Sequence, residues 1–392
     1  MKIVYVSGLM PQKRFYELFK AGKAMPGQQV QKYHRLLTRG LAQNGIEVMA
    51  LSLPPVNRAN YLGLRFKGEQ QTEEGVQFRL LPVWNVPVIK HFGVLLHSFG
   101  AASSELKSKK DAAVVLDILN LSVSLGAALA ARLRKKKIVG IVTDLPEMMD
   151  TNNRGLGARL SARLIKLCTH YVFLTEAMNE RLNPKNKPYA VIEGQVDQAL
   201  DQEDASLPLK DKPRVLLYAG EISRRYGLEM LAEGFLEANI KGAALHYYGW
   251  GDYAEDFARL CAKHDNLYYA GVCPNEQVVE AEKRATLLIN PRPTKEAFTR
   301  YSFPSKNMEY MVSGTPVLTT KLPGMPDSYD PYVFLLDEET KEGVAEALSR
   351  IAALPEEVLQ KKGQAARRFV LLDKNNVQAA ARIIRLLKED KP

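Results

Sequence analysis

The segment Tyr301–Pro316, YSFPSKNMEYMVSGTP, places a lysine and a glutamate where a helix is expected to begin. Pro304 and Ser305 precede Lys306, and Glu309 follows three residues later on the same helix face. Free N–H groups at a helix N-terminus attract anions, so a lysine there is unfavourable unless an anion lies beside it. A diphosphate meets that need, and the carboxylate one turn on suits the two hydroxyls of a ribose. The segment therefore predicts a nucleoside diphosphate site; the structural alternative is a Ser305 cap with a surface Lys306–Glu309 ion pair.

A second loop, in the segment Leu216–Leu231 (LLYAGEISRRYGLEML), also has residues suited to phosphate. Gly220 ends an expected strand and lets a ligand approach the backbone, because glycine has no side chain. Arg224 and Arg225 follow before a helix that begins near Gly227, and guanidinium groups offer forked donors to phosphate. Taken alone, the loop is better explained as two solvated arginines; beside the lysine segment it favours phosphate.

Charge is distributed unevenly over the 392 residues, whose formal net charge is +10. Residues 1–200 hold 28 Lys and Arg against 15 Asp and Glu (+13), whereas residues 201–392 hold 26 against 29 (−3). The basic first half indicates an anionic partner there, namely nucleic acid, an anionic membrane or a phosphorylated substrate, unless it is only a solvated surface. No apolar run is long enough for a membrane span, and three cysteines without a CxxC pair fit a reducing cytoplasm.

Short apolar strands alternate with amphipathic helices in both halves, which predicts an α/β protein with two doubly wound, mostly parallel sheets. Ligands bind such sheets at the carboxyl ends of strands, so the loops that follow strands are the places to search. The expected division is a first domain at 1–198, a polar linker at 199–213 and a second domain at 214–373, with a helix at about 374–392 that packs back on the first domain. The expected strands cover residues 2–8, 46–53, 112–119, 137–145, 171–176, 189–194, 214–220, 244–251, 267–272, 286–292, 316–320 and 333–337.

Five segments occur in an order that resembles a known family: YAGEISRRYGLEMLAEGF, LHYYGWGDYAEDF, LYYAGVCPNEQVVEAEKRATLLINPRP, YSFPSKNMEYMVSGTPVLTT and LPGMPD. Together they resemble the C-terminal domain of family-4 glycosyltransferases with the GT-B fold. These are retaining enzymes that use nucleotide-sugar donors, and many build bacterial polysaccharides and glycolipids. The first half resembles the acceptor domain of that family more weakly, in TDLPEMMD, VFLTEAMNERL and VIEGQVDQ. The resemblance covers nearly the whole chain and implies two Rossmann-like domains that face a central cleft.

The resemblance implies roles for residues of the second domain. Lys306 would hold the donor diphosphate, assisted by Arg224 and Arg225, and these three are the expected catalytic residues. The expected donor-binding residues are Gly220, Val272, Tyr301, Ser305 and Glu309. Glu309 would hold the ribose hydroxyls, and the backbone near Val272 would meet the base.

In the first domain, the resemblance implies a contribution from the long loop after the first strand. Gly27 and Gln28 would face the diphosphate and the transferred sugar. Asp144, in TDLP, would lie on the acceptor side. These three residues are the expected acceptor and cleft residues.

The chain departs from the family pattern at four positions. The usual first glutamate, arginine, lysine and histidine are replaced by Tyr301, Glu221, Tyr226 and Thr143. Arg224 and Arg225 are expected to supply the missing charges from a neighbouring turn. The departures put the donor sugar, the contacts to its hydroxyls and the activity itself in question, and FPSK before the helix resembles a variant of the family.

Several other chemistries lack a motif in this sequence. The six histidines show no metal-binding spacing, and there is no D-x-D, which agrees with a metal-independent site without a cofactor. No P-loop and no G-x-S-x-G motif is present, which argues against a P-loop kinase and against a hydrolase of that type. A nucleic-acid partner is not indicated, because the sequence contains no recognisable module for stacking bases or reading a groove.

Two segments mix aromatic, aliphatic and basic residues: Val83–Phe99 and Arg159–Tyr171. Each fits an amphipathic helix packed on the sheet, which is the favoured interpretation. Each also fits an interfacial surface that docks on anionic lipid, and the charge of the first half supports that alternative.

The sequence therefore predicts a glycosyltransferase that moves a sugar from a nucleoside diphosphate donor, preferably a UDP-sugar, to an acceptor hydroxyl with retention. The expected acceptor is a glycan or lipid-linked molecule in polysaccharide or glycoconjugate assembly. The expected location is the cytoplasm, with the inner face of the membrane as a peripheral alternative. A catalytically silent partner subunit and a nucleotide-sugar 2-epimerase remain as alternatives.

Overall fold

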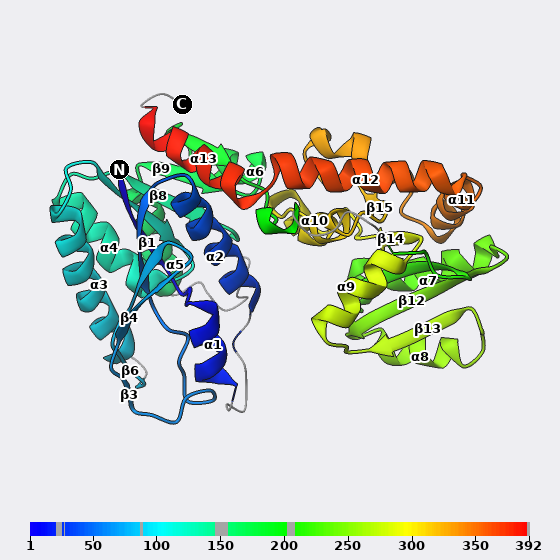
Figure 1. The fold of residues 1–392 in the computed structure, drawn as a ribbon, viewed down its shortest axis with the longest axis horizontal. Helices are drawn as coiled ribbons and strands as arrows, with labels where there is room; N and C mark the ends of the chain where they lie inside the picture. The colour runs from blue at the N-terminus through cyan, green and yellow to red at the C-terminus, as the bar shows by residue number, and fades with distance from the viewer. Residues whose placement is uncertain (21–25, 27, 87–88, 146–155, 202–207, 390–392) are drawn as a thin grey trace. The chain divides into compact units, whose positions relative to one another are not determined.

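A computed structural model describes residues 1–20, 26, 28–86, 89–145, 156–201 and 208–389 (Figure 1). Contacts divide the chain into unit 1, which is Met1–Gln195 with Asn376–Pro392, and unit 2, which is Val196–Asn375. The chain passes between the units twice, near Val196 and near Asn375. A hydrogen bond joins these two places, because Val196 N–H donates to Lys374 O at 3.0 Å. The residues expected as a linker, 199–213, belong to unit 2, and 202–207 lie outside the described residues.

Unit 1 contains an eight-stranded sheet, whose strands in spatial order are β10 (Tyr189–Val191), β9 (His170–Phe173), β8 (Ile138–Val142), β7 (Ala112–Asp117), β1 (Lys2–Ser7), β2 (Glu47–Ser52), β5 (Val76–Leu80) and β4 (Glu69–Glu73). All neighbours are parallel except the edge pair β4–β5. Strands β1, β7, β8 and β9 are buried along their whole length, as their uninterrupted apolar runs predict.

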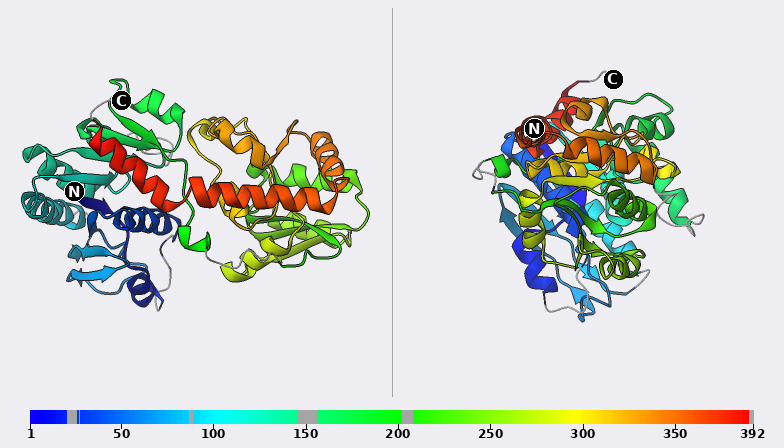
Figure 2. Two further views of the ribbon diagram at one scale, coloured as in Figure 1. Left: turned by 45° about the horizontal axis from the view of Figure 1, so that its top comes forward. Right: turned by 90° about the vertical axis from the view of Figure 1, so that its right-hand side faces the viewer.

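The helices of unit 1 are α1 (Gln12–Phe19), α2 (Gln28–Gln43), α3 (Ile89–Lys107), α4 (Leu121–Leu133), α5 (Leu156–Leu167), α6 (Glu176–Leu182) and α13 (Asn376–Lys388). Helix α13 comes from the C-terminal end of the chain and lies beside α2 (Figures 1 and 2). Ile3 and Tyr5 of β1 share a buried cluster with Leu37 of α2 and Ile383 of α13. Burial of these apolar side chains explains why the C-terminal helix packs on unit 1.

The antiparallel part of unit 1 was not predicted from the sequence. Glu74 and Gly75, with φ of 49° and 77°, turn the chain between β4 and β5. A separate two-stranded sheet pairs β3 (Arg65–Phe66) with β6 (Val83–Trp84). The side chains of β4 alternate between half-buried and exposed, which suits a polar edge strand.

Unit 2 contains a six-stranded sheet, all parallel, in the order β13 (Leu267–Gly271), β12 (Ala243–Trp250), β11 (Arg214–Glu221), β14 (Leu287–Asn290), β15 (Val317–Thr320) and β16 (Phe334–Leu336). Its helices are α7 (Leu228–Ala238), α8 (Ala254–Cys261), α9 (Asn275–Arg284), α10 (Ser305–Val312), α11 (Lys341–Ala352) and α12 (Glu356–Asp373). The predicted fold class, two doubly wound α/β sheets, is confirmed, and every expected strand forms. Among the described helices, none has the length and hydropathy that crossing a bilayer requires.

The contact between α2 and α13 gives a first testable expectation. Gly40→Ala should lower the free energy of unfolding by about 1–3 kcal/mol, because a Cβ at Gly40 would lie 2.1 Å from Asn376 O. Gly100→Ala is the matched control, since Gly100 lies in α3 with open space around it and should gain about 0.5–1 kcal/mol of helix stability. Denaturant unfolding measures both; equal effects at the two glycines would contradict the close packing of α13.

Candidate functional site

Lys306 lies in the first turn of α10 and reaches back to the carboxyl end of β11. Its Nζ donates to Ala219 O at 2.7 Å and lies 5.4 Å from the ring centre of Tyr218. Burial lowers the pKa of Lys306 from its ordinary value, and the charge of Glu309 acts in the opposite direction. An ammonium has three donors. Ala219 O is the acceptor that Lys306 uses among the described residues, which leaves donors for a ligand.

Gly220 makes this approach of Lys306 possible. Its φ is +145°, which side chains rarely adopt, and a Cβ there would lie 1.9 Å from Lys306 Nζ. From the sequence, Gly220 was expected to let a ligand approach the backbone. In the structure it is the side chain of Lys306 that makes this close approach. Any other residue at 220 would displace the ammonium from the strand end.

Tyr310 holds the same strand end from the next turn of α10, a contact that the sequence analysis missed. Its hydroxyl accepts from Ala219 N–H at 2.9 Å and lies 3.2 Å from Ala219 O. Lys306 and Tyr310 are four residues apart and therefore share one helix face. This spacing was visible in the sequence and is the signal that could have identified Tyr310.

A buried amide network fixes the first turn of α10 from the other side. Asn290, at the end of β14, donates through Nδ2 to Asn307 Oδ1 at 2.7 Å. Asn307 donates in turn to Thr319 Oγ1 of β15 at 3.0 Å. Because Asn307 follows Lys306 directly, the network orients the start of the helix that carries the lysine.

The other expected residues near α10 are placed as follows. Ser305 is the exposed first residue of α10, and the cap position is Pro304 without a side-chain hydrogen bond, so Ser305 is not the cap of the structural alternative. Glu309 is exposed one turn on, and Tyr301 is half-buried at the end of the short 3₁₀ helix Ala297–Tyr301. No contact in the described residues assigns a ligand role to these three side chains.

Arg224 and Arg225 form a short 3₁₀ turn after β11, and both bind carboxylates of the protein. Arg224 pairs with Glu229 at 3.1 Å and with Asp256, and it donates to Asp252 O at 3.2 Å. These contacts raise the pKa of Arg224, chiefly through the hydrogen bond to Asp256. The guanidinium expected at the phosphate is therefore already engaged by three oxygen acceptors.

Arg225 is engaged on a different side. Its guanidinium lies 3.5 Å from a Glu296 carboxylate oxygen and 4.3 Å from the ring centre of Phe298. The charge of Arg225 is therefore balanced locally by Glu296. This pairing favours another arginine as the second cation beside Lys306.

Arg292 is the candidate for this role, and the sequence analysis missed it. It follows β14 by two residues, and its guanidinium carbon is 4.7 Å from the ring centres of both Tyr226 and Phe298. Its Nε is buried and has no hydrogen-bond partner among the described residues. The charge of Arg292 also lowers the pKa of Lys306, so the two cations act on each other. An anion beside both would relieve this repulsion.

The strand register shows how Arg292 could have been found. Leu217 of β11 pairs with Leu288 of β14, and extending this register places Gly220 beside Pro291. Arg292 in NPRP is thus a cation directly after a strand end, next to the glycine that the sequence analysis had singled out. Val272 also follows a strand, β13, and its side chain is exposed beyond Gly271, whose φ is 68°.

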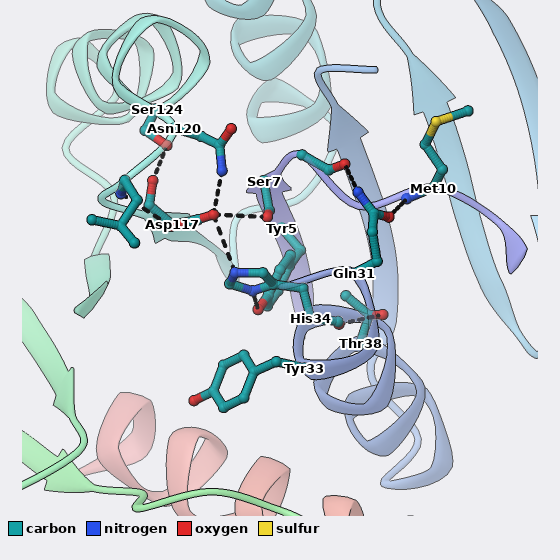
Figure 3. A network of polar contacts seen from close by, with 12 residues as sticks. Tyr5, Ser7, Met10, Gln31, Tyr33, His34, Thr38, Asp117, Asn120 and Ser124 are labelled. Carbon is teal, nitrogen blue, oxygen red and sulfur yellow. Dashed lines mark hydrogen bonds and ion pairs between the residues drawn. The ribbon is translucent and has the colours of Figure 1, made fainter. Parts of the chain in front are cut away.

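In unit 1, a buried polar network lies at the carboxyl ends of β1 and β7 (Figure 3). His34 Nε2 is 3.1 Å from Asp117 Oδ2, and its Nδ1 is 2.6 Å from the hydroxyl of Tyr5. Ser7 donates to the same carboxylate oxygen at 3.0 Å, and Asn120 also donates to it. Burial would raise the pKa of Asp117, but the charge and hydrogen bond of His34, with the other donors, bring it below its ordinary value.

Gln31, one turn before His34 on α2, forms hydrogen bonds with the chain that follows β1. Gln31 accepts from Met10 N–H at 2.9 Å and donates to Gly8 O at 2.6 Å, as Figure 3 shows. The loop expected to face the diphosphate continues from there, but Gly27 lies outside the described residues, as does the side chain of Gln28. The hydrogen bonds of Gln31 therefore fix the start of that loop, as far as the structure describes it.

Asp144 follows β8, and its side chain is exposed. The surrounding protein raises the pKa of Asp144 by burial, and the charge of Asp117 raises it further. Residues 146–155, directly after it, lie outside the described residues. In the described part of the chain, no group of three His, Cys, Asp or Glu side chains is arranged to hold a metal ion.

Comparison with known proteins finds a family match within unit 2. Residues 201–369 match the family described as glycosyl transferases group 1. Sucrose-phosphate synthase from Thermosynechococcus elongatus has a similar structure, with a TM-score of 0.62 and 16% identity over 99% of each chain. HepE from Anabaena, in complex with UDP, has a TM-score of 0.64 and 13% identity over 99% of this chain and 100% of its own.

OtsA, a trehalose-6-phosphate synthase, has a TM-score of 0.66 and 12% identity over 99% of each chain. At such low identities these likenesses show the fold, which is GT-B. No curated protein sequence matches the chain. The segment that matches the glycosyl transferases group 1 family lies within unit 2.

Proposed function

We propose that the protein transfers a sugar from a UDP-sugar to an acceptor hydroxyl with retention of the anomeric configuration. The observation that carries the proposal is the Lys306 ammonium in the first turn of α10, held against the glycine at the end of β11 and close to a second cation, Arg292. HepE is in complex with UDP, and the E. coli trehalose-6-phosphate structure is bound with UDP-2-fluoro glucose, which supports uracil as the base.

In this reaction the bond from the anomeric carbon to the diphosphate oxygen breaks, and a bond to the acceptor oxygen forms on the same face. The acceptor proton passes to an oxygen of the departing diphosphate, so no protein nucleophile is needed. Lys306, Arg292 and the first N–H groups of α10 stabilise the charge that develops on the diphosphate. Because side-chain cations supply this charge, we expect turnover without an added divalent metal, even with a chelator present.

The remaining expected residues keep their roles within the proposal. Glu309 holds the ribose hydroxyls, and the backbone near Val272 meets the uracil. Gly27 and Gln28 face the diphosphate and the transferred sugar, and Asp144 lies on the acceptor side. The acceptor is a glycan or a lipid-linked molecule in polysaccharide or glycoconjugate assembly, and the protein acts in the cytoplasm, at the inner face of the membrane.

A catalytically silent partner subunit is the second candidate, because Tyr301 stands where the family usually has a glutamate. Such a protein would bind UDP and release no product. A 2-epimerase would isomerise the donor without an acceptor. Product analysis separates the three.

The test is a panel of nucleotides and nucleotide sugars. UDP and at least one UDP-sugar should raise the midpoint of thermal unfolding by several degrees at millimolar concentration, whereas ADP and GDP should raise it less. The stabilising donor should then give a product with an acceptor, and NMR of the anomeric proton should show retention. Failure of every nucleotide to stabilise the protein would end the proposal, and stabilisation without any product would favour the silent subunit.

A further inference from the structure

Unit 1 exposes a group of large apolar side chains, here called the apolar rim. Its members and their exposed fractions are Leu62 (101%), Leu64 (73%), Trp84 (45%), Ile89 (57%), Phe92 (67%) and Leu96 (52%). They fall between residues 62 and 96, while the other exposed large apolar side chains are spread over the rest of the described chain. On ordinary protein surfaces, exposed apolar residues are scattered singly. A group of six within 35 residues of sequence is therefore unusual.

Backbone contacts join the three segments of the apolar rim into one surface. Arg65, next to Leu64, pairs with Trp84 across the β3–β6 sheet, and Asn85 N–H donates to Leu64 O at 2.8 Å. Lys90 Nζ donates to Val56 O at 2.6 Å, which ties the first turn of α3 to the loop before β3. Figure 1 shows β3 and β6 beside the same end of α3.

Helix α3 has two different faces. Val94, Ser98 and Ala101 are buried, and Ser98 donates to Val123 O of α4 at 2.6 Å. Ile89, Phe92 and Leu96 recur at i, i+3 and i+7, so they form a stripe along a second, exposed face. The helix therefore packs on its neighbour, as favoured from the sequence, and keeps an apolar face that no described element covers.

The two segments that carry the apolar rim have charge of one sign. Segments 54–68 and 82–100 contain four basic residues, Arg58, Arg65, Lys67 and Lys90, and no Asp or Glu. The Arg65 guanidinium lies 5.0 Å from the ring centre of Trp84, a pairing of cation and indole suited to a membrane interface. A two-fold dimer through this surface would bring like charges together, which disfavours a second copy as the occupant.

We propose that the apolar rim docks on the surface of an anionic lipid bilayer, with the apolar side chains among the acyl chains and Arg58, Arg65 and Lys67 at the headgroups. Docking places unit 1 where a lipid-linked acceptor would be found. The inference deepens the membrane location in the proposed function and does not depend on the donor chemistry.

Tryptophan fluorescence tests the docking directly. The chain has two tryptophans, so Trp250→Phe leaves Trp84, in the apolar rim, as the sole reporter. Vesicles of phosphatidylcholine with about 30 mol% phosphatidylglycerol should shift its emission to shorter wavelength, and brominated lipid should quench it. Phosphatidylcholine alone, or high salt, should weaken both signals at least severalfold.

Matched double variants separate the apolar rim from other exposed apolar residues. Phe92→Ser/Leu96→Ser should lower the vesicle partition coefficient at least tenfold, whereas Leu129→Ser/Leu133→Ser on α4 should change it less than about threefold. Thermal stabilisation by UDP should be the same in both, so a failure of docking is distinguishable from a failure of the donor site. Equal partition of the two double variants would overturn the proposal. So would a Trp84 shift that needs higher protein concentration but no lipid, which would identify a second copy as the occupant.

Discussion

Replacing Lys306 with methionine is expected to lower kcat for donor turnover by roughly 10²–10³-fold, the usual cost of removing one preorganised group that stabilises transition-state charge. The ammonium acts on the negative charge that grows on the diphosphate as its bond to the sugar breaks. Methionine keeps an unbranched apolar stem and removes the charge and the donors. Binding of the uncharged parts of the donor should change less, so kcat should fall more than the affinity for UDP.

The Lys306→Met protein should remain folded, which makes the loss interpretable. Ala219 O keeps a hydrogen bond from Tyr310 at 3.2 Å when the lysine is gone. Burial already lowers the pKa of Lys306, so the charged amine is costly to hold without an anion. Denaturant unfolding should confirm a free energy within about 1 kcal/mol of the wild type. Unchanged turnover in a folded variant would remove Lys306 from the diphosphate.

Two arginine variants, measured beside the lysine variant, show which cation accompanies it. Arg292→Met should weaken UDP binding by roughly 10-fold or more, because a charge-assisted bond to phosphate is lost. Arg225→Met is the control, since Arg225 is paired with Glu296 and stacked on Phe298, and it should weaken binding less than about threefold. Titration calorimetry with UDP measures both, and the reverse ranking would return the phosphate role to the turn after β11.

The sequence was sufficient for the parallel sheets, because buried parallel strands are continuous apolar runs such as KIVYVS and AAVVLD. It was not sufficient for the antiparallel edge at β4 and β5. There the strand EQQTE is polar on both faces, and only the Glu74–Gly75 turn indicates a hairpin. A strand of this kind has no apolar pattern that distinguishes it from a loop.

The candidate site was predicted in part for a similar physical reason. Lys306 and Gly220 could be found because each is unusual in its own local context, a cation at a helix start and a glycine at a strand end. Whether an arginine is available to a ligand depends instead on distant carboxylates and rings. Asp256 engages Arg224 from α8, and Phe298 lies against Arg292, contacts that no local spacing reveals.

Replacing His34 with leucine is expected to lower the stability of unit 1 by about 3–5 kcal/mol, because it leaves the Asp117 carboxylate buried without the imidazole nitrogen that lies 3.1 Å from it. Both side chains are only 1% exposed, so water cannot substitute for the imidazole. His97→Leu is the control: His97 is exposed on α3, and its loss should change stability by less than about 0.5 kcal/mol. Denaturant unfolding of the two variants near neutral pH measures the difference.

The pH dependence of this loss identifies its cause. In the wild type the folded pKa of Asp117 is depressed, so its contribution is present above the unfolded pKa of about 3.9 and is lost as pH falls through the folded pKa. Without His34, burial is the largest remaining influence, the pKa of Asp117 rises, and stability is lost as pH rises instead. The gap between wild type and His34→Leu should therefore widen as pH rises above the unfolded pKa of about 3.9. Adding Asp117→Asn to the variant should remove the loss of stability that the variant itself shows as pH rises. A gap that is already constant in the single variant would mean that His34 stabilises unit 1 by packing and not through the Asp117 carboxylate.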